Sequence, residues 1–219
     1  MDDTYTKDGL PAAMSARDVE VVKKERVWSG YFHVDRYLFR HRLYRGGWTP
    51  PFMREIFERG HAVAVLLYDR AKDRMVLIEQ FRPGAYVAAC APHVQHAFSP
   101  WLIEIVAGII DEGEAPEDVA RREAVEEAGC TIGELLPITT ILASPGGSTE
   151  TIVLFLGYID APGEGGVHGL HEEHEDIRVL VASPDEVWGW IDDGRIVNGP
   201  TLVGLQWFRI HQEQLRARR

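Results

Sequence analysis

The chain has 219 residues, of which 45% are hydrophobic and 26% charged, a composition that fits one globular domain with an appended subdomain. Its formal net charge of -11 disfavours nonspecific binding to nucleic acid, so an anionic substrate needs metal ions as a bridge. No apolar run approaches the roughly 18 residues that cross a bilayer. Two cysteines occur, Cys90 and Cys130, and the N-terminal segment lacks the apolar run of a signal peptide. We therefore expect a reduced, cytoplasmic protein that does not bind membranes.

The first third of the chain predicts strands. Residues 1 to about 25 are polar and predict a mobile lead-in. Aromatic and β-branched residues recur over 26–43, which predicts antiparallel strands, and the turn cluster Arg45-Gly46-Gly47 ends that segment. Strongly apolar runs over 61–68 and 75–81 then predict a hairpin.

The remainder predicts a strand-rich sheet with interspersed helices. A helix is expected over 116–128, because Pro116 suits the first helical position and Gly129 suits the C-terminal cap. A connection over 160–176 is too long to lack a role in a compact domain. The other expected elements are an irregular loop over 83–100, a strand over 101–106, a glycine-bounded loop over 108–113, strands over 135–142, 151–159 and 177–181, and helices over 184–191 and 200–215.

The helix over 116–128 carries acids where apolar residues are expected. On a helical wheel Glu127 lies beside Ala120, and Glu123 lies between Glu127 and Val119. Burying two like charges is costly unless they are paired or bind a cation, and Mg²⁺ prefers carboxylate oxygens. The alternative is an acidic, solvated helix stabilised by neighbouring arginines.

The spacing around this helix favours the first interpretation. Gly108, Glu114, the pair Arg122-Glu123, the pair Glu126-Glu127 and Gly129 stand at the spacing of a complete Nudix box, and the chain is similar to Nudix hydrolases. The aliphatic positions of that pattern are filled by smaller residues, Ala124 and Cys130.

A narrower resemblance runs from about Arg36 to the C-terminus. The segments HRLYRGG, REIFERGHA, VLIEQFR, LASPGGSTE, HEDIRV and LQW resemble bacterial ADP-ribose pyrophosphatases, and Pro145 stands fifteen positions after the box, as in that subgroup. The resemblance implies an α/β (α+β) fold: a Nudix α/β/α sandwich with a mixed sheet over 58–219, and a small N-terminal antiparallel β subdomain over 1–57.

The resemblance also implies roles for the acids. Glu123, Glu127 and the carbonyl of Ala107 resemble ligands of catalytic Mg²⁺, which Mn²⁺ can replace, with Glu126 as a supporting ligand and Arg122 as their orienting partner. In the long loop, Glu173 maps onto the catalytic base and Glu175 onto a further metal ligand. The implied reaction is hydrolysis of ADP-ribose to AMP and ribose 5-phosphate.

Substrate contacts are implied in the same way. Arg82 resembles an arginine that meets the substrate, and Ser144 with Glu150 resembles a ribose-contacting loop. The resemblance further implies a homodimer with swapped N-terminal strands, in which the partner supplies an aromatic ring for adenine. The candidates from the partner are Phe32 or Tyr31, with Arg54 beside them; each also has an ordinary structural explanation.

Several alternatives remain open. Cys90, His93 and His96 have the spacing of a Zn²⁺ site, but no fourth ligand is evident, and solvated side chains are the better explanation. His168, His171 and His174 are expected to be solvated or titrating rather than ligating. For function, a pyrophosphatase for GDP-mannose or ADP-glucose and a non-catalytic Nudix ligand sensor compete with ADP-ribose hydrolysis.

Overall fold

The computed structural model describes residues 14–92 and 98–217, except for the side chain of Glu173. They form two compact units, which are considered separately. The first unit comprises the described residues up to Arg59 together with Ser144–Glu150, and the second comprises Gly60–Ala143 and Thr151 onward. None of the described helices is both long and apolar enough to cross a membrane.

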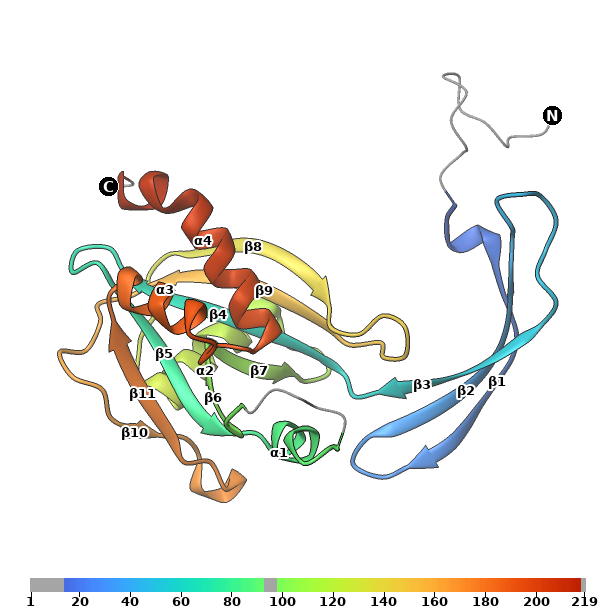
Figure 1. The fold of residues 1–219 in the computed structure, drawn as a ribbon, viewed down its shortest axis with the longest axis horizontal. Helices are drawn as coiled ribbons and strands as arrows, with labels where there is room; N and C mark the ends of the chain where they lie inside the picture. The colour runs from blue at the N-terminus through green and yellow to red at the C-terminus, as the bar shows by residue number, and fades with distance from the viewer. Residues whose placement is uncertain (1–13, 93–97, 218–219) are drawn as a thin grey trace. The chain divides into compact units, whose positions relative to one another are not determined.

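The first unit is built on a three-stranded antiparallel sheet in the order β1-β2-β3 (Figure 1). The strands are β1 (Val19–Ser29), β2 (His33–His41) and β3 (Phe52–Glu58), and a short 3-10 turn (Ala16–Asp18) precedes β1. The expected mobile lead-in is wrong for residues 19–25, because β1 pairs with β2 from Val19 onward, and the first 13 residues of the lead-in lie outside the described ones. Most side chains of β1 are exposed, so the strand has little of the apolar alternation that reveals strands in a sequence.

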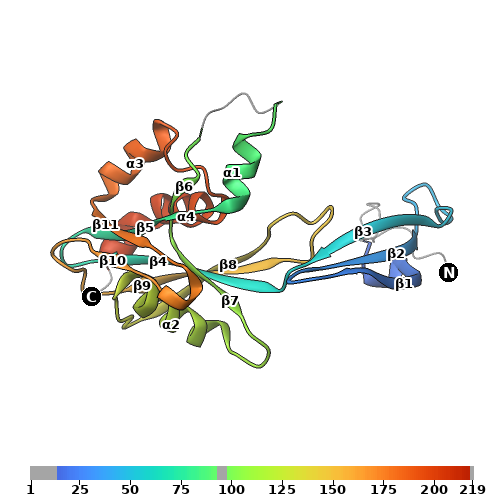
Figure 2. The ribbon, with the colours of Figure 1, turned by 90° about the horizontal axis from the view of Figure 1, so that it is seen from below.

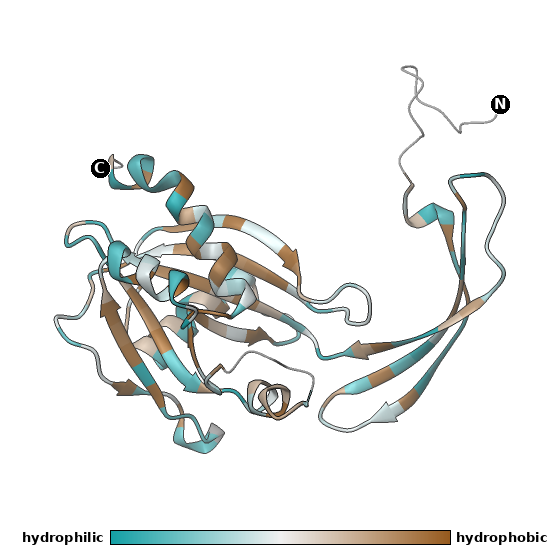
Figure 3. Ribbon diagram, viewed as in Figure 1, coloured by the Kyte–Doolittle hydropathy of each residue, from teal (hydrophilic) through white to brown (hydrophobic). Residues whose placement is uncertain are grey.

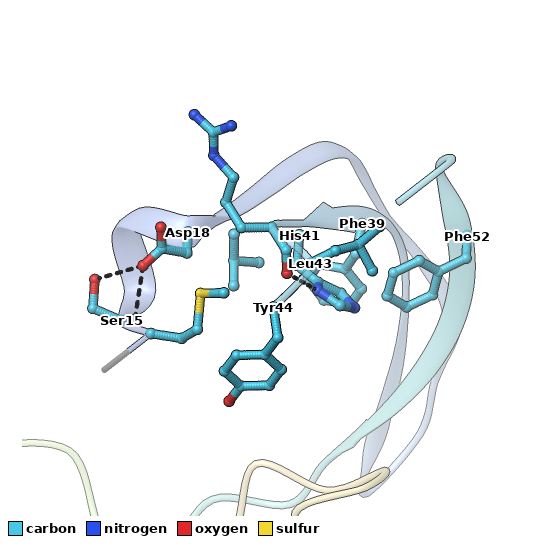
Figure 4. A pocket seen from close by; sticks show the side chains of 10 residues that line it. Ser15, Asp18, Phe39, His41, Leu43, Tyr44 and Phe52 are labelled. Carbon is cyan, nitrogen blue, oxygen red and sulfur yellow. Dashed lines mark hydrogen bonds between the residues drawn. The ribbon is translucent and has the colours of Figure 1, made fainter. Parts of the chain in front are cut away.

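A hollow of about 440 Å³ lies in the first unit (Figure 4). Its lining is mainly apolar and includes Met14, Phe39, Leu43 and Phe52. The nearby Asp18 carboxylate accepts hydrogen bonds from the backbone and hydroxyl of Ser15. The hollow contains none of the acids expected to bind metal.

The second unit is built on an eight-stranded mixed sheet. The main order is β10-β11-β5-β4-β9-β8, with β6 beside β5 and β7 beside β4, and only the β4–β9 pairing among them is parallel. The strands are β4 (His61–Asp69), β5 (Arg74–Phe81), β6 (Trp101–Glu104), β7 (Val106–Ile110), β8 (Leu135–Leu142), β9 (Thr151–Tyr158), β10 (Val167–His168) and β11 (Ile177–Ala182).

Helices cover both faces of this sheet (Figure 2). Helix α2 (Pro116–Ala128) packs on one face, where it shares a core with Val63 and Val65 of β4. Helices α3 (Pro184–Asp192) and α4 (Gly199–Ala217) pack on the other face, with Leu66 of the same strand. Alternate residues of β4 therefore enter opposite cores, as the two-residue period of a strand requires. Hydrophobic residues accordingly follow the strands of the larger sheet (Figure 3). This is the sandwich that the resemblance implied.

The structure differs from the sequence-based expectations in three loops. Helix α1 (Pro83–Ala89) occupies part of the expected irregular loop over 83–100. The expected loop over 108–113 begins inside β7, which pairs with β4 up to Ile110. The connection over 160–176 contains β10 and a 3-10 turn (His171–Glu173). These elements are too short to show a periodic pattern in the sequence. The strands β7 and β10 also depend on pairing with other strands.

Candidate active site

Helix α2 has well-defined ends, and the face that it packs on the sheet carries an acid. Pro116 stands in the first turn, and Gly129 ends the helix in the left-handed conformation with φ 64°. Val119, Ala120 and Ala124 are buried against the sheet, as the helical wheel predicted. Glu127 lies among them with only 3% of its surface exposed. A carboxylate in such a place requires partners.

The partners of Glu127 are neutral. The backbone N–H of Ala107 in β7 donates to Glu127 Oε2 at 3.0 Å, and the side chain of Gln80 in β5 donates to Oε1 at 3.3 Å. Burial raises the pKa of Glu127 to about 8, although the Ala107 hydrogen bond acts in the opposite direction. The described residues of β5 and β7 thus hold the carboxyl through neutral donors, and no cation in the described part of the chain is in direct contact with it.

Glu123 lies one turn earlier and is also mostly buried, with 13% of its side chain exposed. Burial raises its pKa to about 7, while the charge of Arg122 acts to lower it. Arg122 Nη1 donates to Glu123 at 2.8 Å and to Glu126 at 3.0 Å, and Arg122 lies 3.6 Å from Glu114. Arg122 therefore lies among three acids, Glu114, Glu123 and Glu126.

Glycine is required opposite Glu123. A Cβ atom at Gly108 would overlap the Glu123 carboxylate. The glycine of the motif therefore has a physical reason: the strand approaches the helix so closely that only a hydrogen atom fits between backbone and acid.

The loop between β9 and β11 brings Glu175 to the same place. The charge of Glu175 raises the pKa of both Glu123 and Glu127, so it acts on both acids. Its carboxylate accepts the backbone N–H of Leu170 at 3.1 Å, and the N–H of Gly169 donates to the Glu126 carbonyl at 3.2 Å. The backbone of Glu173 lies in the 3-10 turn, and its side chain is outside the described residues.

This donor set suits a hard divalent cation. Glu123, Glu126, Glu127 and Glu175 supply carboxylate oxygens, the ligands that Mg²⁺ prefers. Among the described residues, no group of three or more His, Cys, Asp or Glu side chains is so placed that it could hold a metal ion as it stands. The oxygens of Glu127 instead face neutral donors, and those of Glu123 face Arg122. An open acidic cluster of this kind fits an ion that keeps several waters and shares its coordination with phosphate.

Arg82 belongs to this site, together with residues that the sequence did not single out. It follows β5 and precedes α1, and its charge acts on the pKa of Glu127. Arg82 Nε donates to Glu104 Oε2 at 2.8 Å, and Asn198 donates to Glu104 Oε1 at 2.6 Å. Glu104 interrupts the apolar run over 101–106, which is the one sequence signal that pointed to it. Gln80 and Asn198 have no such signal.

The other expected substrate contacts belong to the first unit. Glu150 is 9% exposed and pairs with Arg59 at 3.0 Å, and Ser144 lies in the same segment of this unit. Phe32 packs edge-on against Phe57 and against Tyr31, which is 85% exposed. The guanidinium of Arg54 lies over the ring of Phe52.

The expected alternatives for metal binding have different outcomes. Cys90 is exposed and free at the end of α1, whereas His93 and His96 lie outside the described residues. Cys130 is free and buried. The ring of His168 lies against Gly129, where an added Cβ atom would come within 2.6 Å of it. His168 therefore packs against the end of α2.

Comparisons with known proteins define the class. Residues 58–203 match the family described as the NUDIX domain. This match spans α2, its acids and both helical layers, and the chain belongs to the Nudix family.

Individual relatives are similar over nearly the whole chain. The ADP-ribose pyrophosphatase of Escherichia coli (strain K12) is 44% identical over 95% of this chain and 96% of its own length. The GDP-mannose pyrophosphatase of Pectobacterium atrosepticum is 33% identical over 86% of this chain and 92% of its own length. A solved structure of an ADP compounds hydrolase has a TM-score of 0.67, with 16% identity, over 94% of this chain and all of that chain. That last likeness concerns the fold alone.

Proposed function

We propose that this chain is a Mg²⁺-dependent hydrolase that cleaves the diphosphate of ADP-ribose into AMP and ribose 5-phosphate. The observation that carries the proposal is the cluster of acids on α2, in which Glu123 and Glu127 are buried and lack enough cations of the chain's own. The similarity to an ADP-ribose pyrophosphatase at 44% identity supports the choice of substrate.

The proposed metal ligands are Glu123, Glu127, Glu175 and the carbonyl of Ala107, with Glu126 in support. A divalent cation supplies positive charge that offsets the charge of the diphosphate while water attacks phosphorus. Mg²⁺ fits the oxygen donors, and Mn²⁺ is a possible substitute.

The chain's own residues have distinct tasks in the reaction. Glu173 accepts the proton of the attacking water, and its position on a loop allows it to approach the bound substrate. Arg122 orients Glu123 and Glu126 through the two hydrogen bonds described above. Arg82 contacts the anionic substrate, a role supported by its position close enough to Glu127 for its charge to lower the pKa of that acid.

Two further features of the proposal concern assembly and location. The first is a homodimer with swapped N-terminal strands, in which the partner supplies Phe32 or Tyr31, with Arg54, to a nucleotide that Ser144 and Glu150 also contact. The exposed aromatic ring of Tyr31 supports this assembly. The net charge of -11 supports the absence of nucleic-acid partners, and the unpaired cysteines support a reducing compartment such as the cytoplasm.

Competing functions share the same acids. GDP-mannose or ADP-glucose as the substrate leaves the α2 chemistry unchanged and alters only the nucleotide and sugar contacts. A non-catalytic sensor is disfavoured, because every acid of the motif is present and, among the described residues, Glu127 makes hydrogen bonds only to neutral donors.

The deciding experiment measures nucleoside monophosphate release from ADP-ribose, GDP-mannose and ADP-glucose, each with Mg²⁺, Mn²⁺ and EDTA. We expect the highest kcat/KM for ADP-ribose, with activity lost in EDTA. A preference for another sugar contradicts the substrate, and activity retained in EDTA contradicts the metal role. Absence of cleavage of all three contradicts the enzyme and favours the sensor.

A further inference from the structure

The guanidinium of Arg82 is fixed on one side only. Its Nε donates to the buried Glu104 at 2.8 Å. Within the described part of the chain, its two terminal amino groups have no side-chain partner. The Arg82 side chain is 38% exposed, so an anion can reach it from solvent.

Glu104 is in turn fixed by the start of α4. Asn198 donates from Nδ2 to Glu104 Oε1 at 2.6 Å. Its Oδ1 accepts the backbone N–H and the hydroxyl of Thr201 at 3.0 and 2.8 Å, so Asn198 caps the helix. These two bonds decide which end of the amide faces Glu104.

Thr201 connects the same network to the sheet. Its hydroxyl oxygen accepts the backbone N–H of Ile105, the residue between β6 and β7, at 3.0 Å. Thr201 is fully buried and Glu104 is 3% exposed. We call Glu104, Asn198 and Thr201 the α4 relay.

A purely structural role does not explain this arrangement. An ion pair between a buried carboxylate and a partly exposed arginine adds little net stability, because the cost of desolvating the charges offsets their attraction. Burial raises the pKa of Glu104 even though Arg82 is in contact with it. Keeping Glu104 charged in this buried position therefore costs stability. That cost has an explanation if the function requires Arg82 to be held in one orientation.

We propose that the α4 relay positions Arg82 so that its terminal amino groups bind the diphosphate of the substrate. Arginine is suited to this, since its planar guanidinium binds phosphate oxygens with two parallel hydrogen bonds when its orientation is fixed. The relay residues touch neither the substrate nor the reacting atoms. This inference rests on the proposed function, because it takes a nucleoside diphosphate sugar as the ligand.

The test is a double-mutant cycle between Arg82 and the relay. Asn198→Asp keeps the helix cap but replaces the donor to Glu104 by an acceptor of like charge. The dissociation constant is measured by calorimetry with Mg²⁺ and an ADP-ribose analogue in which CH₂ replaces the bridging oxygen, and kcat and KM are measured with ADP-ribose. We expect Asn198→Asp to weaken binding and raise KM about tenfold with a smaller change in kcat.

The cycle distinguishes positioning from folding. Arg82→Ala is expected to weaken binding at least tenfold, and adding Asn198→Asp to it is expected to have no further effect. Equal effects of Asn198→Asp with and without Arg82 overturn the proposal, as does unchanged binding in a stable Asn198→Asp variant. Asn198→Ser, which also caps a helix but is too short to reach Glu104, serves if the aspartate variant fails to fold.

Two control variants remove the same kinds of interaction, an ion pair and a helix cap, at other places in the fold. Glu79→Gln removes the Arg178–Glu79 pair between β11 and β5, and Ser183→Ala removes the cap of α3. Both are expected to leave the dissociation constant unchanged, while Ser183→Ala lowers Tm.

Binding and cleavage measurements on the wild-type protein distinguish failure of the proposed substrate from failure of the relay proposal. If it prefers another nucleotide sugar, the substrate assignment fails and the cycle is run with that sugar. If it binds none of the three, the relay proposal fails as well.

Discussion

Two of the buried carboxylates, Asp35 in the first unit and Glu127 in the second, have opposite electrostatic surroundings. Asp35 in β2 is fully buried and lies 2.7 Å from Arg26 and 2.9 Å from Lys24. These cations hold its pKa well below the usual range. Glu127 is 3% exposed but faces an amide and a backbone N–H, and burial raises its pKa to about 8.

The difference shows what each acid is for. The charge of Asp35 in β2 is balanced by Arg26 and Lys24 of β1. These ion pairs link the two strands, and no cation from solution is required. Glu127 stands near Glu123 and Glu175, whose charges raise its pKa further. Burying a charged carboxylate near two other acids costs free energy, and a cation bound from solution would offset that cost.

The largest expected effect follows from removing the charge of Glu127. Glu127→Gln keeps the shape and a hydrogen-bonding carbonyl but removes a proposed metal ligand. We expect kcat/KM for ADP-ribose to fall about a thousandfold, since metal catalysis contributes several kcal/mol. Without metal, the Tm should be unchanged or higher, because a buried charge is lost.

The matched control is Glu117→Gln, an exposed acid in the first turn of the same helix. It should retain wild-type kcat/KM. Normal activity of a folded Glu127→Gln variant would show that the metal assignment is incorrect.

A smaller loss is expected when the site is crowded rather than neutralised. In Gly108→Ala the new methyl group overlaps the Glu123 carboxylate and displaces it. We expect kcat/KM to fall about a hundredfold, in line with the cost of misplacing catalytic groups by about 1 Å. In Gly189→Ala within α3 the methyl group meets nothing within 4 Å, so activity should be unchanged and stability equal or higher. Equal activity of the two variants would contradict the close approach of β7 to Glu123.

Elements with internal signals were predictable from the sequence. The helix over 116–128 has the bounds that Pro116 and Gly129 predicted, and the hairpin of β4 and β5 follows from its continuous apolar strands. Strand β1 was missed over 19–25, and helix α1 was missed entirely. The first is mostly exposed and is stabilised by pairing with β2, and the second is a single short helix with no buried residue.

The site divides in the same way. The acids of α2 were predictable because their spacing lies within one helix. Glu104 and Asn198 were not, because they are 94 positions apart and meet only after β6 and α4 have packed. Gln80 reaches Glu127 across 47 positions for the same reason.

The pH dependence of metal-free stability sharpens the comparison. Glu123 and Glu127 have folded-state pKa values of about 7 and about 8, above the 4.5 of an unperturbed glutamate. The folded state therefore binds more protons than the unfolded state between these values, so stability falls as pH rises from about 4.5 to about 8. We expect a loss on the order of 2 kcal/mol in urea unfolding with EDTA.

The same measurement has two checks. Glu127→Gln should flatten the curve, and Mg²⁺ should restore stability at high pH because it binds the charged carboxylates. A metal-free protein that gains stability from pH 5 to pH 8 would contradict the raised pKa values.

The smallest effect is expected for Asp35, whose pKa shift has the opposite sign. A lowered pKa contributes stability that is present above the unfolded value of about 3.9 and is lost as pH falls through the folded value. Asp35→Asn should therefore reduce the hydrogen-exchange protection of the β1–β2 amides at neutral pH, by about tenfold, because Arg26 and Lys24 lose their shared partner. The difference between the variant and the wild type should begin to shrink below about pH 4 and should disappear only as the pH falls through the lowered pKa of Asp35. Added Mg²⁺ should change neither result, since this carboxylate already has its cations; Mg²⁺-dependent protection at β1–β2 would mean that the two buried acids are not independent.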